Sequence, residues 1–223
     1  MAKRARAFAE KGFHGVKIKV GFDLDQDTRI VRAVREELGK DFTIMTDANQ
    51  GYSVDVGLKA AEAFSRLGVF WLEEPLFAED IEGHARLRER GKVPIAVGEN
   101  LHTYYAFENF VARGAVDFLQ PDVARAGGIT EIRKIASLAT KHDLTVSFHT
   151  WGDAVALATS LHLSAALKVC GVMELDYTYN PLREELLKAP LEVKNGFMAP
   201  PDKPGLGVEL DPKVTASGGL SFV

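Results

Sequence analysis

The sequence lacks several features that would assign it to common protein classes. Its 223 residues contain one cysteine, Cys170, which excludes an internal disulfide framework and a cysteine-rich zinc module. A single thiol suits a reducing compartment, and we expect a cytoplasmic protein. No apolar run reaches the roughly 18 residues of a transmembrane helix. Charged residues interrupt the segment after the basic N-terminus, so it does not resemble a secretory signal.

A large excess of one charge is also missing. The 27 basic and 31 acidic side chains give a formal net charge of −4, which argues against a surface for nucleic acid or anionic membranes. Walker loops, Gly-x-Gly-x-x-Gly turns and Gly-x-Ser-x-Gly elbows do not occur. The composition is that of an ordinary globular protein, with 46% hydrophobic and 26% charged residues.

The chain does contain a regular alternation of amphipathic, helix-like stretches with short apolar runs. Most of the early helical stretches end at a glycine, which is typical of a helix C-terminus. Strands alternating with helices predict parallel βαβ units, and apolar strands of this kind are buried on both faces. The predicted strands span residues 15–20, 42–47, 69–73, 95–99, 116–122, 144–149 and 172–175.

Each predicted strand carries an ionisable residue at or near its C-terminal end. In a (β/α) barrel these ends converge on one mouth, where active sites lie. In an open, doubly wound sheet the same groups would spread along an edge. The regular intervals of 23 to 28 residues favour the barrel. The residues are Lys19, Asp47, Glu73, Glu99, Asp122, His149 and Glu174.

Three consecutive strand ends carry carboxylates: Asp47, Glu73 and Glu99. Alternation predicts that they share the faces of Met45, Trp71 and Val97, respectively. Singly, each could be a surface or helix-capping residue. Aimed together into a barrel, they would repel one another, and burying each unpaired would cost several kcal/mol. A divalent cation resolves this repulsion, and an all-oxygen ligand set favours Mg²⁺ over zinc.

Two lysines share one face of the first predicted strand. Lys17 and Lys19 alternate with Val16, Ile18 and Val20, so if the aliphatic side chains pack on helices, both ammonium groups point into the barrel. The alternative is an edge strand with solvated lysines. Buried lysines shift their pKa readily and can act as bases.

Asp122 and His149 lie at the ends of neighbouring predicted strands. An aspartate bonded to one imidazole nitrogen raises the basicity of the other, so this pair predicts a general acid/base opposite the lysines. Glu174 closes the ring and could hydrogen-bond a substrate or a metal-bound oxygen, although a cap or tail contact is an almost equal alternative.

The ordered set of motifs resembles the mandelate racemase subgroup of the enolase superfamily, a group that is also described as mandelate racemase/muconate lactonizing enzyme-like. The Lys-x-Lys strand at residues 16–21 and the motifs at 46–49, 71–75 and 98–100 are similar to its lysine pair and three metal-ligand motifs. Residues 120–122, 147–152 and 173–176 are similar to its Asp–His dyad and eighth-strand glutamate.

The resemblance implies a TIM-like (β/α)7β barrel that uses Mg²⁺. In such a site the metal and Lys17 hold the carboxylate of a small-molecule substrate, and Lys19 or His149 removes the proton alpha to it. Asn49 would bind substrate or support a ligand. We expect a dehydratase that eliminates water from a sugar acid. A racemase or epimerase of an alpha-hydroxy acid is the alternative, and an inactive barrel fragment is a third.

The sequence departs from the resembled family at its ends. We expect the first barrel strand and the N-terminal α+β capping domain to be missing. Residues 1–176 are predicted to form the catalytic barrel, and residues 177–223, which hold six of the nine prolines, an irregular tail that packs on the barrel or a capping domain. An unclosed barrel side exposes apolar surface, so we expect a homo-oligomer.

Overall fold

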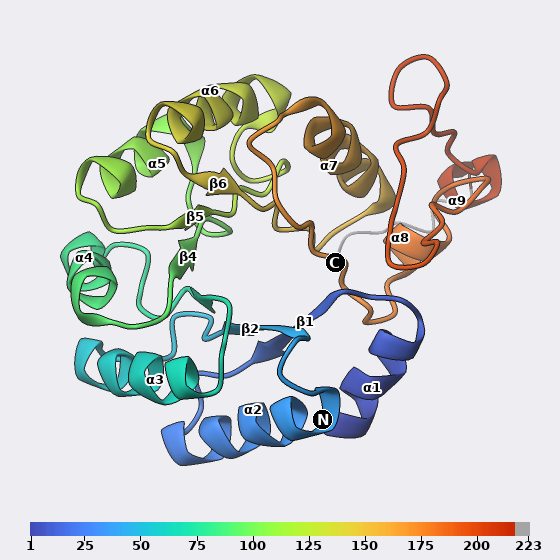
Figure 1. The fold of residues 1–223 in the computed structure, drawn as a ribbon. Coiled ribbons are helices and arrows are strands. Elements are labelled where there is room, and N and C mark those ends of the chain that lie inside the picture. Colours follow the sequence, from blue (N-terminus) through green and yellow to red (C-terminus); the bar gives the residue numbers. More distant parts are fainter. Residues whose placement is uncertain (217–223) are drawn as a thin grey trace.

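The computed structural model describes residues 1–216, which form a parallel α/β barrel with strands inside and helices outside (Figure 1). Six strands pair in sequence order, each parallel to the next. The predicted barrel class is confirmed. The strands are β1 (Gly15–Lys19), β2 (Thr43–Asp47), β3 (Leu72–Glu73), β4 (Ile95–Val97), β5 (Phe118–Leu119) and β6 (Thr145–Val146).

A helix precedes β1 and one follows each strand, which is the arrangement that parallel pairing requires. Side-chain caps accept backbone N–H groups at the starts of several helices, for example Asp23 before α2 and Ser53 before α3. No helix in the described part of the chain combines the length and apolar character needed to cross a membrane. The outer helices are α1 (Ala2–Glu10), α2 (Leu24–Leu38), α3 (Val54–Arg66), α4 (Ile81–Arg90), α5 (Thr103–Ala112), α6 (Gly128–Lys141) and α7 (Ala154–Ala166).

The apolar core lies mainly between the strands and the helices. Outward side chains of the strands, such as Ile44, Leu72 and Leu119, are fully buried against the helical layer. A smaller inner cluster of Met45, Trp71 and Ala96, with Phe118 packed on it, fills the barrel below the strand ends. We call this cluster the barrel floor. The inner face of the strands therefore changes from apolar at the floor to ionisable at the mouth.

The prediction of a seventh strand at residues 172–175 is wrong, because the structure has no regular strand there. Within the described part of the chain residues 172–175 pair with no strand: an isolated parallel bridge joins Val146 to Cys170 just before them, and Thr150 Oγ1 donates to the carbonyl of Glu174. The amide of Gly171 donates to the carbonyl of Val146 at 2.8 Å, after which the chain leaves the sheet. The physical reason is the missing neighbour, because among the described residues β1 pairs only with β2. Instead, Lys17 Nζ lies 2.8 Å from Glu174 Oε1 across the gap.

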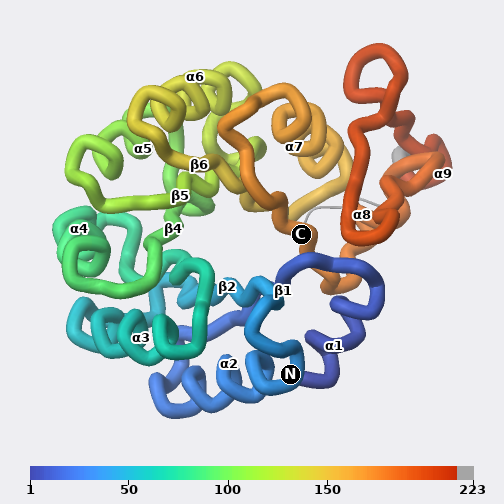
Figure 2. The backbone as a smooth tube through the Cα atoms, viewed as in Figure 1, coloured from blue at the N-terminus to red at the C-terminus, as the bar shows by residue number. Residues whose placement is uncertain are grey.

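Aromatic side chains on the outer side of the barrel also bridge the gap between β1 and the segment that carries Glu174. The ring of Tyr177 meets those of Phe8 and Phe13 edge-on, with centroids 5.0 and 5.5 Å away, and Lys11 Nζ lies 4.8 Å from the Tyr177 centroid. Figure 2 shows the C-terminal segment, which includes α8 (Pro181–Glu184) and α9 (Pro212–Ala216), outside the ring on this side. We call the junction of β1 with residues 170–177 the seam. The domain division at residue 176 stays a prediction, and residues 217–223 of the predicted tail lie outside the described part.

His84 on α4 is a fully buried titratable group away from the barrel mouth. Its Nδ1–H donates to the carbonyl of Asp80 at 2.8 Å, and its ring meets Phe110 edge-on with centroids 5.2 Å apart. Burial lowers the pKa of His84, and the bond to the Asp80 carbonyl only partly opposes this effect. The folded protein therefore keeps this imidazole neutral.

The contribution of His84 to stability is expected to fall as the pH drops through about 6.5, where an unfolded histidine takes up a proton that folded His84 resists. Each unit by which the folded pKa is lowered costs about 1.4 kcal/mol below both pKa values. Other titrating groups are common to both proteins, so in urea unfolding the stability of His84→Leu relative to the parent should rise from pH 7.5 to pH 5.5. Equal pH dependence in the two proteins would contradict this account.

Candidate metal and acid/base site

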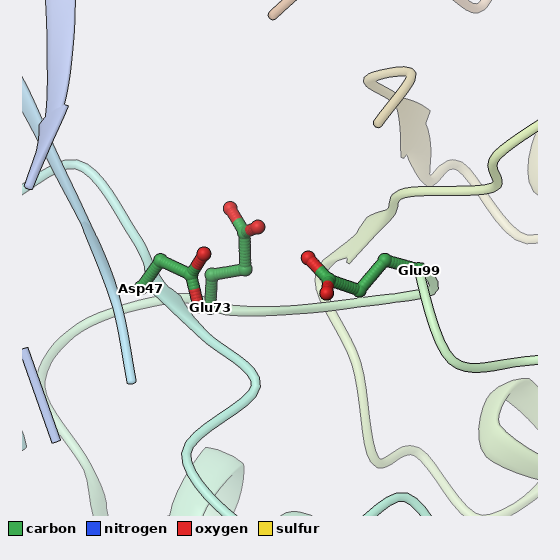
Figure 3. Close-up of side chains that lie close together, drawn as sticks. All are labelled: Asp47, Glu73 and Glu99. Atoms are coloured by element: carbon green, nitrogen blue, oxygen red, sulfur yellow. The ribbon is translucent and has the colours of Figure 1, made fainter. Parts of the chain in front are cut away.

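Three carboxylates converge at the mouth of the barrel. Asp47, Glu73 and Glu99 are 0, 1 and 7% exposed, and one oxygen of each lies within 4.8 Å of the others. Figure 3 shows the three groups turned toward a common space from neighbouring strand ends. Asp47 and Glu73 end β2 and β3 directly, so the pleat aims them inward with Met45 and Trp71.

Glu99 reaches the same space by a different route, and the prediction that it shares the face of Val97 is wrong. Val97 packs outward in the helical core, whereas Ala96 faces the barrel floor. Strand β4 ends at Val97, and Gly98 then turns the chain against the backbone of Gln120. A Cβ on Gly98 would lie 2.4 Å from the carbonyl carbon of Gln120. This close approach, which only glycine permits, breaks the alternation and directs Glu99 inward.

Lys17 lies among carboxylates inside the barrel. Its Nζ is 2.5 Å from Glu73 Oε1, 2.8 Å from Glu174 Oε1 and 3.5 Å from Asp47 Oδ2. Burial opposes its charge, but the charges of Glu73, Glu174 and Asp47 outweigh burial and hold the pKa of Lys17 well above its usual value. Lys17 is therefore a fixed cation, suited to binding a carboxylate rather than to removing a proton.

Lys19 stands nearer to solvent on the same face. Its side chain is 53% exposed, and its Nζ lies 2.5 Å from Asp47 Oδ2 and 3.2 Å from Asn49 Oδ1. The intervening Ile18 and the following Val20 are buried in the helical core, so the two lysines do share the inner face. Strand β1 does lie at the edge of the described sheet, but Lys17 is not solvated as the edge-strand alternative requires, because its side chain is only 13% exposed.

The predicted dyad forms at the ends of neighbouring segments. His149 Nδ1 lies 2.7 Å from Asp122 Oδ2, and Nε2 faces Glu99 Oε2 at 3.3 Å and Glu174 Oε2 at 4.0 Å. Burial would lower the pKa of His149, but the hydrogen bond that Nδ1–H donates to Asp122 and the charges of Glu174 and Glu99 raise it overall. Burial likewise opposes the charge of Asp122, yet the bond to His149 keeps its pKa below the usual value. The Nε2 edge, not Nδ1, is thus the one available for proton transfer.

Asn49 contacts both sides of the carboxylate cluster. Its backbone N–H donates to Asp47 Oδ1 at 2.9 Å, and its Nδ2 donates to Glu99 Oε1 at 3.2 Å. With φ of 45°, it adopts a left-handed conformation that asparagine tolerates better than most residues. Of the two predicted roles, the contacts described are those of a residue that supports ligands, and substrate binding stays a prediction.

Two groups outside the predicted site also contact this cluster: Gln120, to which the sequence prediction gives no role, and Glu74, which alternation with Trp71 sets aside as a ligand in favour of Glu73. Gln120 donates to Glu73 Oε2, and its position two residues before Asp122 on the same face was the available signal. Glu74 is also buried, and its carboxylate accepts from Asn100 Nδ2 at 2.7 Å. Burial, followed by the charge of Glu99, raises the pKa of Glu74 to about 7.

The cluster suits a hard divalent cation. Burial raises the pKa of Glu73 to about 7 even though Lys17 opposes the shift, so the ionised carboxylate is unfavourable unless a cation lies beside it. Within the described residues, the buried Oε2 of Glu99 accepts no hydrogen bond. An oxygen with lone pairs free, beside two further carboxylates, fits Mg²⁺ in donor type and charge. Asp47, Glu73 and Glu99 would be the ligands.

The fold and this site define a class: a parallel α/β barrel with converging carboxylates and an acid/base dyad at its C-terminal strand ends. Comparison with known proteins makes the class specific. The sequence model of the family described as "Enolase C-terminal domain-like" matches residues 1–214, so the chain belongs to this family. The resemblance to mandelate racemase-type members is confirmed.

Individual relatives agree with this assignment. The chain is 41% identical over 209 residues to D-galactarolactone cycloisomerase of Agrobacterium fabrum, covering 90% of this chain and 55% of the relative. It is 39% identical over 202 residues to L-talarate/galactarate dehydratase of Salmonella typhimurium, with 90% and 48% covered. The crystal structure of L-talarate dehydratase from Polaromonas sp. JS666, complexed with Mg and L-glucarate, superimposes with a TM-score of 0.86 at 36% identity, covering 96% of this chain and 58% of that one. The chain therefore spans about half the length of the curated relatives it matches.

Proposed function

We propose that this barrel is the catalytic part of a Mg²⁺-dependent dehydratase that acts on a sugar acid. The proposal rests on one observation: two bases lie on either side of the carboxylate cluster. Lys19 forms an ion pair with Asp47, and His149 Nε2 faces Glu99. The dehydratases among the relatives support the choice of reaction. The substrate is then a small polyhydroxy carboxylate.

The contacts of the ionisable residues indicate a separate role in the reaction for each of them. Bound at Asp47, Glu73 and Glu99, Mg²⁺ would supply positive charge next to the substrate carboxylate, where negative charge develops as the alpha proton leaves. Lys17, a fixed cation, orients that carboxylate. Lys19 Nζ or His149 Nε2 accepts the alpha proton.

Elimination also needs an acid for the departing hydroxyl. In its protonated form, His149 Nε2–H donates a proton to this hydroxyl, which leaves as water, and the resulting enol becomes a 2-keto-3-deoxy acid. The contact between Asp122 and Nδ1 holds the ring in the orientation that this transfer requires. Glu174, which lies between Lys17 and His149, is positioned to hydrogen-bond the substrate.

Epimerisation of an alpha-hydroxy acid is the second candidate, because a base on each side can remove a proton from one face and return it to the other. A racemase is among the relatives: N-succinyl-L-Arg/Lys racemase of Bacillus cereus is 28% identical over 213 residues. The third alternative, an inactive fragment, gains no support from relatives that are enzymes. The homo-oligomer and the cytoplasmic location stay predictions.

Exchange of the alpha proton tests the proposal most directly. In D₂O with Mg²⁺ and a panel of sugar acids, Lys19→Ala and His149→Asn are each expected to slow exchange or turnover by about 10² to 10⁴-fold, the usual contribution of a general base or acid. Lys59→Ala, an exposed lysine on α3, is the matched control. Appearance of a 2-keto-3-deoxy acid supports the dehydratase, and a diastereomer without it supports the epimerase. If both site variants exchanged at the parent rate, the assignment of the two bases would be wrong.

A further inference from the structure

The two oxygens of the Glu73 carboxylate have different surroundings. Oε1 faces Lys17 Nζ at 2.5 Å, in the direction of the other carboxylates. Oε2 points toward the barrel wall, where it accepts hydrogen bonds from Gln120 Nε2 at 2.7 Å and from Trp71 Nε1 at 3.2 Å. Since a carboxylate oxygen offers about two lone-pair positions, two N–H donors use the full capacity of Oε2.

Gln120 is an unusual residue for its position. It is 3% exposed, and within the described residues its Oε1 has no hydrogen-bond partner. A buried amide with an unpaired oxygen is unfavourable for folding, and an apolar side chain of similar size would avoid this cost. Among the described residues, the one polar contact that the side chain makes is the bond from Nε2 to Glu73. The presence of this buried amide is therefore explained by the hydrogen bond that it donates to the Glu73 carboxylate.

The second donor to Glu73 Oε2, the indole N–H of Trp71, is held in place by packing. The indole belongs to the barrel floor, where it packs with Met45 and Ala96 and lies 5.2 Å, centroid to centroid, from the ring of Phe118. Such a ring cannot follow a rotating carboxylate. The two donors together hold the plane of the Glu73 carboxylate against the wall and the floor.

We propose that Gln120, assisted by Trp71, is a positioning residue that presents Glu73 to a divalent cation through Oε1 alone. The inference rests on the proposed metal site and adds to it the reason why Glu73 is a one-oxygen ligand of fixed direction. Partners that orient a ligand typically change metal affinity by about 10 to 100-fold when they are removed.

The test is a calorimetric titration of the full chain with Mn²⁺ and with Mg²⁺. Gln120→Met keeps the length of the side chain and removes the donor, and it is expected to weaken binding by about 10 to 100-fold. Trp71→Phe should weaken it in the same direction. Ser147→Ala is the matched control, because Ser147 is a buried polar residue whose Oγ has no hydrogen-bond partner in the described chain. Its affinity should stay within twofold of the parent.

Thermal unfolding without metal separates positioning from a structural role. Gln120→Met should unfold close to the parent temperature, since removing the buried unpaired oxygen offsets the loss of the hydrogen bond to Glu73. Affinity within twofold of the parent for Gln120→Met, or for Trp71→Phe if the first variant does not fold, would overturn the inference. Absence of metal binding by the parent chain would overturn the metal site together with the inference. Metal binding without proton exchange would remove only the proposed reaction.

Discussion

Glu99→Gln is expected to weaken Mg²⁺ binding by more than about 100-fold, beyond the range for residues that only orient a ligand. Among the three carboxylates, Glu99 is the one that contacts neither lysine at the site, and its buried Oε2 accepts no hydrogen bond from any described residue. Glutamine keeps its size and removes the charge. The change therefore takes away a ligand without leaving a lysine unpaired.

The measurement is the Mg²⁺-dependent shift in unfolding free energy. At a concentration of 100 times Kd, bound metal should stabilise the parent by about 2.7 kcal/mol, and the same concentration should have almost no effect on Glu99→Gln. Without metal, the variant should have a stability similar to that of the parent, because the charge of Glu99 acts unfavourably on buried Glu74 but favourably on protonated His149. Glu62→Gln, an exposed residue on α3, is the control and should keep the full shift. A full Mg²⁺ shift in Glu99→Gln would contradict the assigned ligand set.

Gly98→Ala is expected to destabilise the chain by about 1–3 kcal/mol or more and to abolish metal binding as well. The added Cβ would lie 2.4, 2.5 and 2.6 Å from the carbonyl carbon, oxygen and nitrogen of Gln120. These are backbone atoms of a neighbouring strand end, so they cannot move aside as a flexible side chain would. The segment that carries Glu99 must shift instead.

Gly152→Ala provides the matched comparison, because a Cβ at Gly152 meets no atom within 4 Å. That variant should unfold within about 0.5 kcal/mol of the parent, as is usual for changes that touch nothing. Urea unfolding and Mg²⁺ titration of both variants measure the two effects. Parent-like stability and metal affinity in Gly98→Ala would show that the close approach to Gln120 does not direct Glu99.

Much of the site could be predicted where a regular strand continues to the functional residue. Strand β1 runs through Lys17 to Lys19 and β2 runs to Asp47, so strict alternation gave the correct face for each. The nearly constant interval between strand ends then indicated that these residues meet. The barrel class and its family followed from these same positions.

The remainder depended on contacts between segments that periodicity does not describe. Glu99 faces inward because Gly98 lies against the backbone of Gln120, a neighbour visible only in three dimensions. The seventh strand failed because residues 172–175 have the composition of a strand, yet in the described chain their segment makes only an isolated bridge to β6 and no ladder to β1 on the other side. Gln120 has the sequence pattern of an inward residue, yet its bond to Glu73 joins the ends of β3 and β5, which are separated in the sheet by β4.

The seam bears on how the barrel opens under native conditions. On one side β1 is joined to β2 by a five-residue ladder, while its other side is held by the ion pair of Lys17 with Glu174 and by the aromatic contacts of Tyr177. Side-chain contacts protect few backbone amides. Amide hydrogens along β1 and residues 170–177 should therefore exchange through a partial opening that leaves β2 to β5 intact. Because Lys17 stands at this boundary and contacts Asp47 and Glu73, its ion pairs with the carboxylate cluster should loosen in the same partial opening.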